Sequence, residues 1–197
     1  MRTEIKQFHD LFTSPVFETN LKLDNKKIKN YFYSLEERGF GRIVSNIGGF
    51  QSIDLISHPE DKPQEEIQDL LNDINSFASD VCKMLEIHSV RVYNMWGNIN
   101  RYRDFNWPHT HSDSILSGVY YVKTPPNCGN IEFENPALSG MNRSVNVIGP
   151  NRHNSGNWWL PSQEGKLYIF PGWFRHAVKP NLNKTEDRVS VSFNLFH

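Results

Sequence analysis

The residues best suited to chemistry are the segment His109-Thr110-His111-Ser112-Asp113 and, much later in the chain, His176. Two histidines and one carboxylate on one side of a non-haem Fe(II) leave half of its coordination sphere open for substrates. The pair Arg188 and Ser190 follows, and a guanidinium can hold a carboxylate through two parallel hydrogen bonds while a hydroxyl adds a third. The pattern predicts an iron site beside an anion-binding arginine.

Three residues compete for the two ligand positions in the first segment. In an extended strand, residues two apart point to the same face, so His109, His111 and Asp113 could all project into one cavity. We expect His111 and Asp113 to bind iron together with His176, because a carboxylate adds an anionic attraction that a third imidazole lacks. His109 is the alternative to Asp113 and would give a site of three histidines.

The later residues of this set, His176, Arg188 and Ser190, lie in segments with a strand pattern. Residues 166–170 form a β-rich run, Pro171-Gly172 indicates a turn, and His176 then begins the next strand, where a rigid scaffold can support a ligand. In the segment 188–195, Arg188, Ser190, Ser192 and Asn194 alternate with apolar residues. The polar face of this strand either faces solvent or lines a site, and only the second arrangement suits an arginine that binds a ligand.

Bulk composition excludes several classes of protein. The 197 residues include 21 Lys and Arg and 22 Asp and Glu, a balance that does not favour nucleic acid as a partner. No stretch approaches the roughly 18 apolar residues of a membrane span, and the N-terminus has no apolar signal core. Cys82 and Cys128 do not resemble a disulfide framework. We therefore expect a soluble, cytoplasmic protein without a membrane partner.

The elements that must position these residues change in type along the chain. An edge strand is expected within 11–23, where Pro15 removes one donor, and Asp24 can cap a helix that ends at Gly39. A longer apolar stripe at helical spacing runs over 67–85, in a helix with Pro63 in its first turn. From His88 onward the period is two, and short strands are expected in 90–96, 115–122, 130–134, 166–170 and 188–195.

Helices at the front and strands behind predict an α+β fold, an antiparallel sandwich or jelly roll buttressed by the N-terminal helices. We expect one domain over 1–197, with 1–87 as strand and helical support and 88–197 as the jelly-roll core. Residues 137–165, which end in Trp158-Trp159-Leu160-Pro161, form a long loop rich in Asn, Gly and Ser. This loop is either a lid over the substrate or a surface excursion.

The order His-x-Asp, His and Arg-x-Ser resembles the Fe(II)- and 2-oxoglutarate-dependent dioxygenases. The segments 109–121, 170–176 and 188–194 are more closely similar to a bacterial and phage subgroup of such oxygenases, akin to prolyl 4-hydroxylases. The resemblance is strong over 88–197. That subgroup typically has His-x-His where this chain has His109 and His111.

The resemblance implies a double-stranded β-helix fold and two cofactors, Fe(II) and 2-oxoglutarate. It assigns the metal to His111, Asp113 and His176, and the distal carboxylate of 2-oxoglutarate to Arg188 and Ser190, with Tyr102 as a further co-substrate residue. It also implies that O2 and a peptidyl or small-molecule substrate react, with hydroxylation of a C–H bond and release of succinate and CO2. A non-catalytic jelly-roll binding module and a cupin-like metalloenzyme that does not use 2-oxoglutarate are the alternatives.

Overall fold

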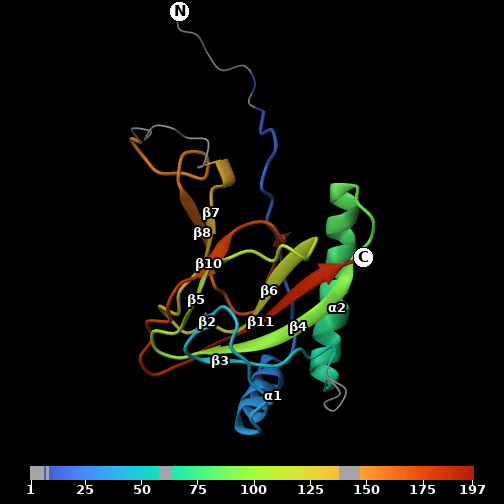
Figure 1. Ribbon diagram of the computed structural model, residues 1–197, viewed down its shortest axis with the longest axis vertical. Helices are drawn as coiled ribbons and strands as arrows, with labels where there is room; N and C mark the ends of the chain where they lie inside the picture. Colours follow the sequence, from blue (N-terminus) through green and yellow to red (C-terminus); the bar gives the residue numbers. More distant parts are fainter. Residues whose placement is uncertain (1–6, 8, 58–63, 138–146) are drawn as a thin grey trace, which may run out of the picture.

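The computed structural model describes residues 7, 9–57, 64–137 and 147–197. Two antiparallel sheets face each other, and two helices pack outside the larger sheet (Figure 1). The elements are β1 (Phe17–Asn20), α1 (Asn25–Glu37), β2 (Asn46–Ile47), β3 (Phe50–Gln51), α2 (Glu65–Leu85), β4 (Arg91–Asn100), β5 (Phe105–His109), β6 (Leu116–Lys123), β7 (Ile131–Glu134), β8 (Asn157–Leu160), β9 (Lys166–Pro171), β10 (His176–Val178) and β11 (Arg188–Phe196).

The larger sheet has six strands in the order β1-β9-β6-β11-β4-β3, and the smaller has five in the order β2-β5-β10-β7-β8. Strands distant in sequence therefore lie side by side, as β11 does between β6 and β4. This is the expected α+β jelly roll with helical support. The period-two pattern of several short segments predicted this fold class. The pattern did not predict β2, β3 or β8.

Both expected helices are present. The carboxylate of Asp24 accepts a hydrogen bond from the backbone N–H of Lys27 and caps α1, as predicted. The helix α2 begins at Glu65, whose acidic side chain suits the positive end of the helix dipole. The expected role of Pro63 lies outside the described residues.

The main core fills the space between the helices and the larger sheet. It is formed by the apolar stripes of α1 and α2 and by the outward-facing side chains of β4, β6, β9 and β11. Gly97 permits the closest contact, because a Cβ atom there would lie 2.1 Å from the ring of Phe32. The helices therefore fix the position of β4 and, through it, of β11.

Strand β11 separates this core from the space between the sheets. Val189, Val191, Phe193 and Leu195 are wholly buried in the main core. Ser190 and Ser192 face the other way and line a cavity between the sheets. The predicted polar face is therefore an inner face, which is the arrangement that a ligand site requires.

Two expectations for irregular regions need correction. The edge strand predicted within 11–23 is limited to β1, because the chain becomes extended and paired only after Pro15, at Phe17. The loop predicted over 137–165 contains β8, whose Trp158 and Trp159 are register partners of Phe133 and Glu132 on β7. β-rich Trp158 and Trp159 thus extend the smaller sheet by one edge strand. Residues 138–146 lie outside the described part of the chain.

Candidate metal centre and co-substrate pocket

Three histidines converge between the two sheets. His109 ends β5, His176 begins β10, and the two are register partners. Their ring centroids are 4.5 Å apart, and the ring of His111 lies 5.0 Å from that of His109 and 5.2 Å from that of His176. One ring nitrogen from each lies within 4.8 Å of the others. This spacing suits three ligands on one side of a single ion.

Asp113 does not join this cluster. Strand β5 ends at His109, and the chain turns at Ser112 and Asp113, where the backbone N–H of Ser114 donates to the carbonyl of His111 over 3.0 Å. The alternation of an extended strand therefore stops before Asp113. Its side chain is exposed and lines a separate surface cavity beside His111. The structure places His109, the stated alternative, where Asp113 was expected.

Burial favours the neutral form of all three imidazoles. Burial and the nearby His109 together lower the pKa of His111 to about 4 and that of His176 to about 3. Burial also lowers the pKa of His109. A histidine binds a metal ion in its neutral form, so these shifts keep the nitrogen lone pairs free for a ligand role.

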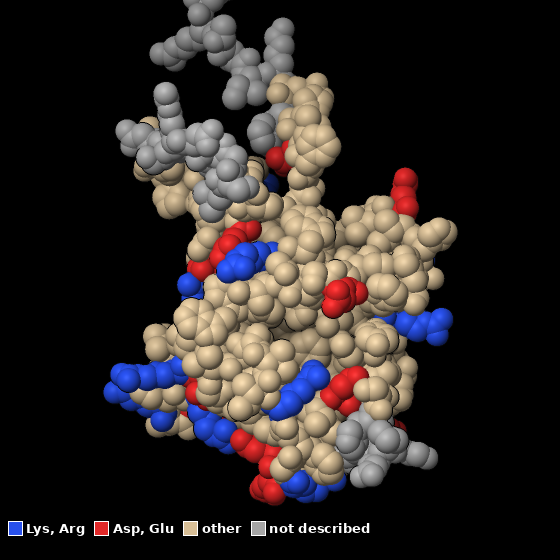
Figure 2. Space-filling view, viewed as in Figure 1, with Lys and Arg blue, Asp and Glu red and all other residues tan. Residues whose placement is uncertain are grey.

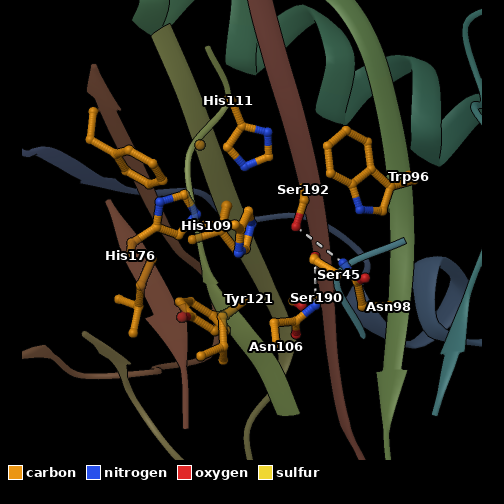
Figure 3. A pocket seen from close by; sticks show the side chains of 15 residues that line it. Ser45, Trp96, Asn98, Asn106, His109, His111, Tyr121, His176, Ser190 and Ser192 are labelled. Carbon is orange, nitrogen blue, oxygen red and sulfur yellow. Dashed lines mark hydrogen bonds between the residues drawn. The ribbon is translucent and has the colours of Figure 1, made fainter. Parts of the chain in front are cut away.

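A small cavity of about 40 Å³ extends from the histidines toward the start of β11. Figure 3 shows His109, His111 and His176 on one side and Trp96, Asn98, Ser190 and Ser192 on the other, with Tyr121 below. The amide of Asn98 donates to Ser192 Oγ over 3.1 Å. This volume holds about one or two water molecules, so a larger ligand must displace side chains as it binds.

Arg188 is wholly buried near Tyr121 of the cavity wall, although it is not itself one of the residues that line the cavity. Its Nη1 donates to the carbonyl oxygens of Cys128 and Lys179, whereas its Nε and Nη2 have no partner among the described residues. Burial lowers the pKa of this guanidinium. Two buried donors of a cation without a partner are costly, and an anionic ligand would satisfy them.

Of the other two predicted co-substrate residues, Ser190 lines the cavity and Tyr102 does not. Tyr121, which was not among the predicted co-substrate residues, also lines the cavity, and its buried hydroxyl has no hydrogen-bond partner in the described part of the chain. Tyr102 lies in the turn between β4 and β5, where Arg103 stands 5.1 Å from its ring centre. Its side chain is 38% exposed, and the residue is not part of the cavity wall. The structure thus brings Ser190 and Tyr121, but not Tyr102, to the site.

Sequence reasoning missed several residues of the wall, among them Trp96, Asn106 and Ser45. Trp96 was assigned only to an alternating strand, yet its ring lies 6.1 Å from that of His111. Asn106 and Ser45 line the polar end and contact each other at 3.4 Å. The register shift between His176 and Val178 allows Asn106 and His109, three residues apart, to face the same cavity. A period of two could not have shown this.

The molecular surface has no single dominant sign in the view of Figure 2, where basic and acidic side chains lie interspersed around a mostly uncharged centre. Among the described residues, no helix is long and apolar enough to cross a membrane.

The fold and the site together define the class of the protein, a double-stranded β-helix oxygenase, and the family follows from the sequence. Residues 94–194, about half of the chain, match the model of the family described as "Putative 2OG-Fe(II) oxygenase". The chain belongs to this family of 2-oxoglutarate- and Fe(II)-dependent oxygenases, and its cofactors are Fe(II) and 2-oxoglutarate. Among curated proteins, no match was found.

Solved structures share the fold at low sequence identity. A prolyl-4-hydroxylase from Pseudomonas putida is 13% identical, with a TM-score of 0.64, and the match covers 93% of this chain and 92% of that one. A Trichoplax adhaerens prolyl hydroxylase in complex with a hypoxia-inducible factor peptide is 14% identical, with a TM-score of 0.66 and coverages of 93% and 84%. HygX from Streptomyces hygroscopicus, with nickel, 2-oxoglutarate and hygromycin B bound, is 9% identical, with a TM-score of 0.58 and coverages of 93% and 83%.

Proposed function

We propose that His109, His111 and His176 are the three protein ligands of the Fe(II) ion. The convergence of their ring nitrogens within 4.8 Å carries this proposal. A site of three neutral imidazoles leaves the full double positive charge on the metal. That charge attracts the end of an anionic co-substrate such as 2-oxoglutarate that binds the metal, and it is larger than the charge left by a ligand set with one carboxylate.

Arg188 and Ser190 are proposed to hold the distal carboxylate of 2-oxoglutarate. The unpartnered Nε and Nη2 of Arg188 form one edge of the guanidinium, the geometry that binds a carboxylate through two parallel hydrogen bonds. The hydroxyls of Ser190 and Tyr121 line the cavity and can add hydrogen bonds. A binding module or a metalloenzyme without 2-oxoglutarate has no use for a buried cation with two donors free for an anion.

When bound, Fe(II) and 2-oxoglutarate supply the oxidising chemistry: O2 and 2-oxoglutarate are converted to succinate and CO2, and one oxygen atom enters a C–H bond of the substrate. The described residues have supporting roles. Trp96, Phe133 and Phe170 surround the histidines with apolar surface, and the rings of Phe133 and Phe170 lie 6.0 and 4.7 Å from that of His176. This apolar lining excludes water and protects the reaction from side reactions.

The substrate is proposed to be a peptide or a small molecule that is hydroxylated at a C–H bond. One of the similar structures is a hydroxylase with a bound peptide, and another holds hygromycin B, a small molecule. The mixed surface charge favours neither polyanions nor nucleic acid. Both cysteines are free and buried, which suits the cytoplasmic location expected from the sequence.

Anaerobic titration with Fe(II) and 2-oxoglutarate tests the proposal. A weak visible charge-transfer band should appear in the wild-type protein, and succinate should form slowly when O2 is admitted without a substrate. The Arg188→Met variant should keep iron binding and lose the band. Folded, iron-loaded wild-type protein that shows neither band nor succinate would contradict the proposed function.

A further inference from the structure

The three histidines differ in how their rings are held. Nδ1 of His109 lies 2.5 Å from the carbonyl oxygen of Trp107, and Nδ1 of His176 lies 2.9 Å from that of Phe174. Such bonds fix the tautomer and direct Nε2 toward a metal. For His111, no hydrogen bond to the ring exists within the described part of the chain. Its orientation must therefore come from another source.

The backbone of His111 is held from both sides. Its N–H donates to the carbonyl of Gly172 over 2.8 Å, and its carbonyl accepts from the backbone N–H and the hydroxyl of Ser114 at 3.0 and 2.9 Å. Gly172 packs so closely that a Cβ atom there would lie 2.7 Å from the His111 carbonyl oxygen and 2.5 Å from Ser114 Oγ. Ser114 thus contacts both the ligand residue and the strand end beside it.

Ser114 begins a series of hydrogen-bonded side chains that ends at β11. Ser114 Oγ lies 2.8 Å from Ser117 Oγ, and Ser117 Oγ donates to the side-chain Oδ1 of Asn194 over 2.8 Å. Ser117 is only 1% exposed, so water does not compete for its hydroxyl. The turn that carries His111 is in this way tied to the strand that carries Ser190 and Arg188.

The number of available protons determines which group donates in each hydrogen bond of this series. Three contacts link the His111 carbonyl, the two hydroxyls and the amide, but two hydroxyls provide only two protons. With Oδ1 of Asn194 as the acceptor of Ser117, and the His111 carbonyl as the acceptor of Ser114, the contact between the two hydroxyls has no proton. Rotation of the Asn194 amide by 180° exchanges its oxygen and nitrogen. Asn194 then donates to Ser117, Ser117 to Ser114, and Ser114 to the His111 carbonyl. Every contact then has one proton.

We propose that Ser114, Ser117 and Asn194 are positioning residues for the metal ligand His111. Their series of hydrogen bonds takes the place of the hydrogen bond that the His111 ring lacks. The inference rests on the proposed three-histidine iron site. It makes the alignment of His111 depend on Ser114 in its own turn and on Ser117 and Asn194 in β6 and β11, and it requires a donor at position 194.

The Fe(II) dissociation constant, measured under anaerobic conditions, tests the inference. Loss of an outer-shell partner typically weakens metal binding by about 10- to 100-fold, and we expect this for Ser114→Ala and Asn194→Asp. The aspartate keeps the size of Asn194 but has no donor. Ser112→Ala is the matched control, because Ser112 is an exposed residue of the same turn, and it should bind Fe(II) like the wild type.

A purely structural role predicts a different result. Circular dichroism and urea unfolding of the metal-free variants measure loss of fold. The positioning role requires that Fe(II) binding weakens while the unfolding midpoint stays unchanged, or that binding weakens by more than the loss of stability explains. The double variant Ser114→Ala/Ser117→Ala should bind Fe(II) about as weakly as Ser114→Ala alone, because the loss of one member already interrupts the series of hydrogen bonds.

The outcomes separate this inference from the proposed function. Wild-type protein that binds no Fe(II) would overturn the iron site and this inference with it. Wild-type binding together with unchanged affinity in both Ser114→Ala and Asn194→Asp would overturn the positioning role alone.

Discussion

His109 and His176 face each other as register partners at the ends of β5 and β10, with their ring centres 4.5 Å apart. The pairing of two strands thus brings together two histidines that are far apart in sequence. Because sheet register sets the distance between these two histidines, no loop has to close to bring them together. The geometry of this ligand pair is therefore built into the smaller sheet before any ion binds.

Replacement of His109 by alanine should abolish Fe(II) binding or weaken it by well over the roughly 100-fold that the loss of an outer-shell group costs. Asp113→Ala should leave binding almost unchanged, because its exposed carboxylate lies outside the cluster. Anaerobic Fe(II) titration measures both. The reverse ranking would show that Asp113 is the ligand and that its turn rearranges around the metal.

The metal-free protein should lose stability as the pH falls below about 6.5. The folded-state pKa values of His111 and His176 are about 4 and about 3, and the ordinary value is about 6.5. Between these values the unfolded chain binds protons that the folded chain does not. The sign is therefore a loss of stability on acidification, at most about 1.4 kcal/mol per pH unit for each histidine.

Urea unfolding of the metal-free protein at pH 7, 6 and 5 measures this dependence. His176→Gln should flatten the profile, whereas the same change at the exposed His88 should not. A wild-type profile with no slope between pH 7 and 5 would contradict the neutral, buried state of the histidines.

Arg188→Lys should raise the KM for 2-oxoglutarate by about 10- to 100-fold, since one charged hydrogen bond is worth about 1.5–3 kcal/mol and lysine cannot bind a carboxylate through a fork. Succinate formation at varied 2-oxoglutarate measures this. Arg175→Lys is the control, because Arg175 is exposed and pairs with Glu134 over 2.8 Å. An unchanged KM in the Arg188 variant would place the co-substrate elsewhere.

Gly97→Ala should destabilise the fold by about 1–3 kcal/mol, the usual cost of overpacking a core, because the added carbon would meet the ring of Phe32 at 2.1 Å. The matched control is Gly149→Ala, where an added Cβ meets nothing within 4 Å. Urea unfolding compares the two variants. Equal midpoints would mean that α1 shifts freely against β4.

The sequence predicted the features that depend on a regular period. The helix stripes, the strand that begins at His176 and the two faces of β11 follow from spacings of 3.6 and two residues, and the structure confirms them. The family resemblance was confirmed as well. Each of these features is local or is carried by a motif.

The choice between His109 and Asp113 shows where periodicity fails. Parity treats 109–113 as one strand, but the hydrogen bond from Ser114 to His111 closes a turn and sends Asp113 outward. Tyr102, which the resemblance and not periodicity suggested, lies in the turn between β4 and β5 and outside the cavity wall. Asn106 enters the site only through an irregular register. Turns and bulges arise from tertiary packing that a single sequence does not display.

The two faces of β11 make this strand intolerant of insertions and deletions. Removal of one residue between Arg188 and Phe193 would exchange the faces over part of the strand. Serines would then enter the helix-covered core, and valines would replace the hydroxyls beside the histidines. The register shift between Asn194 and Leu195 offers the one irregularity of the β11 and β4 pair. The pairing of β11 with β6 is also irregular between Val189 and Ser190, so length variation in this strand is expected only near these two points.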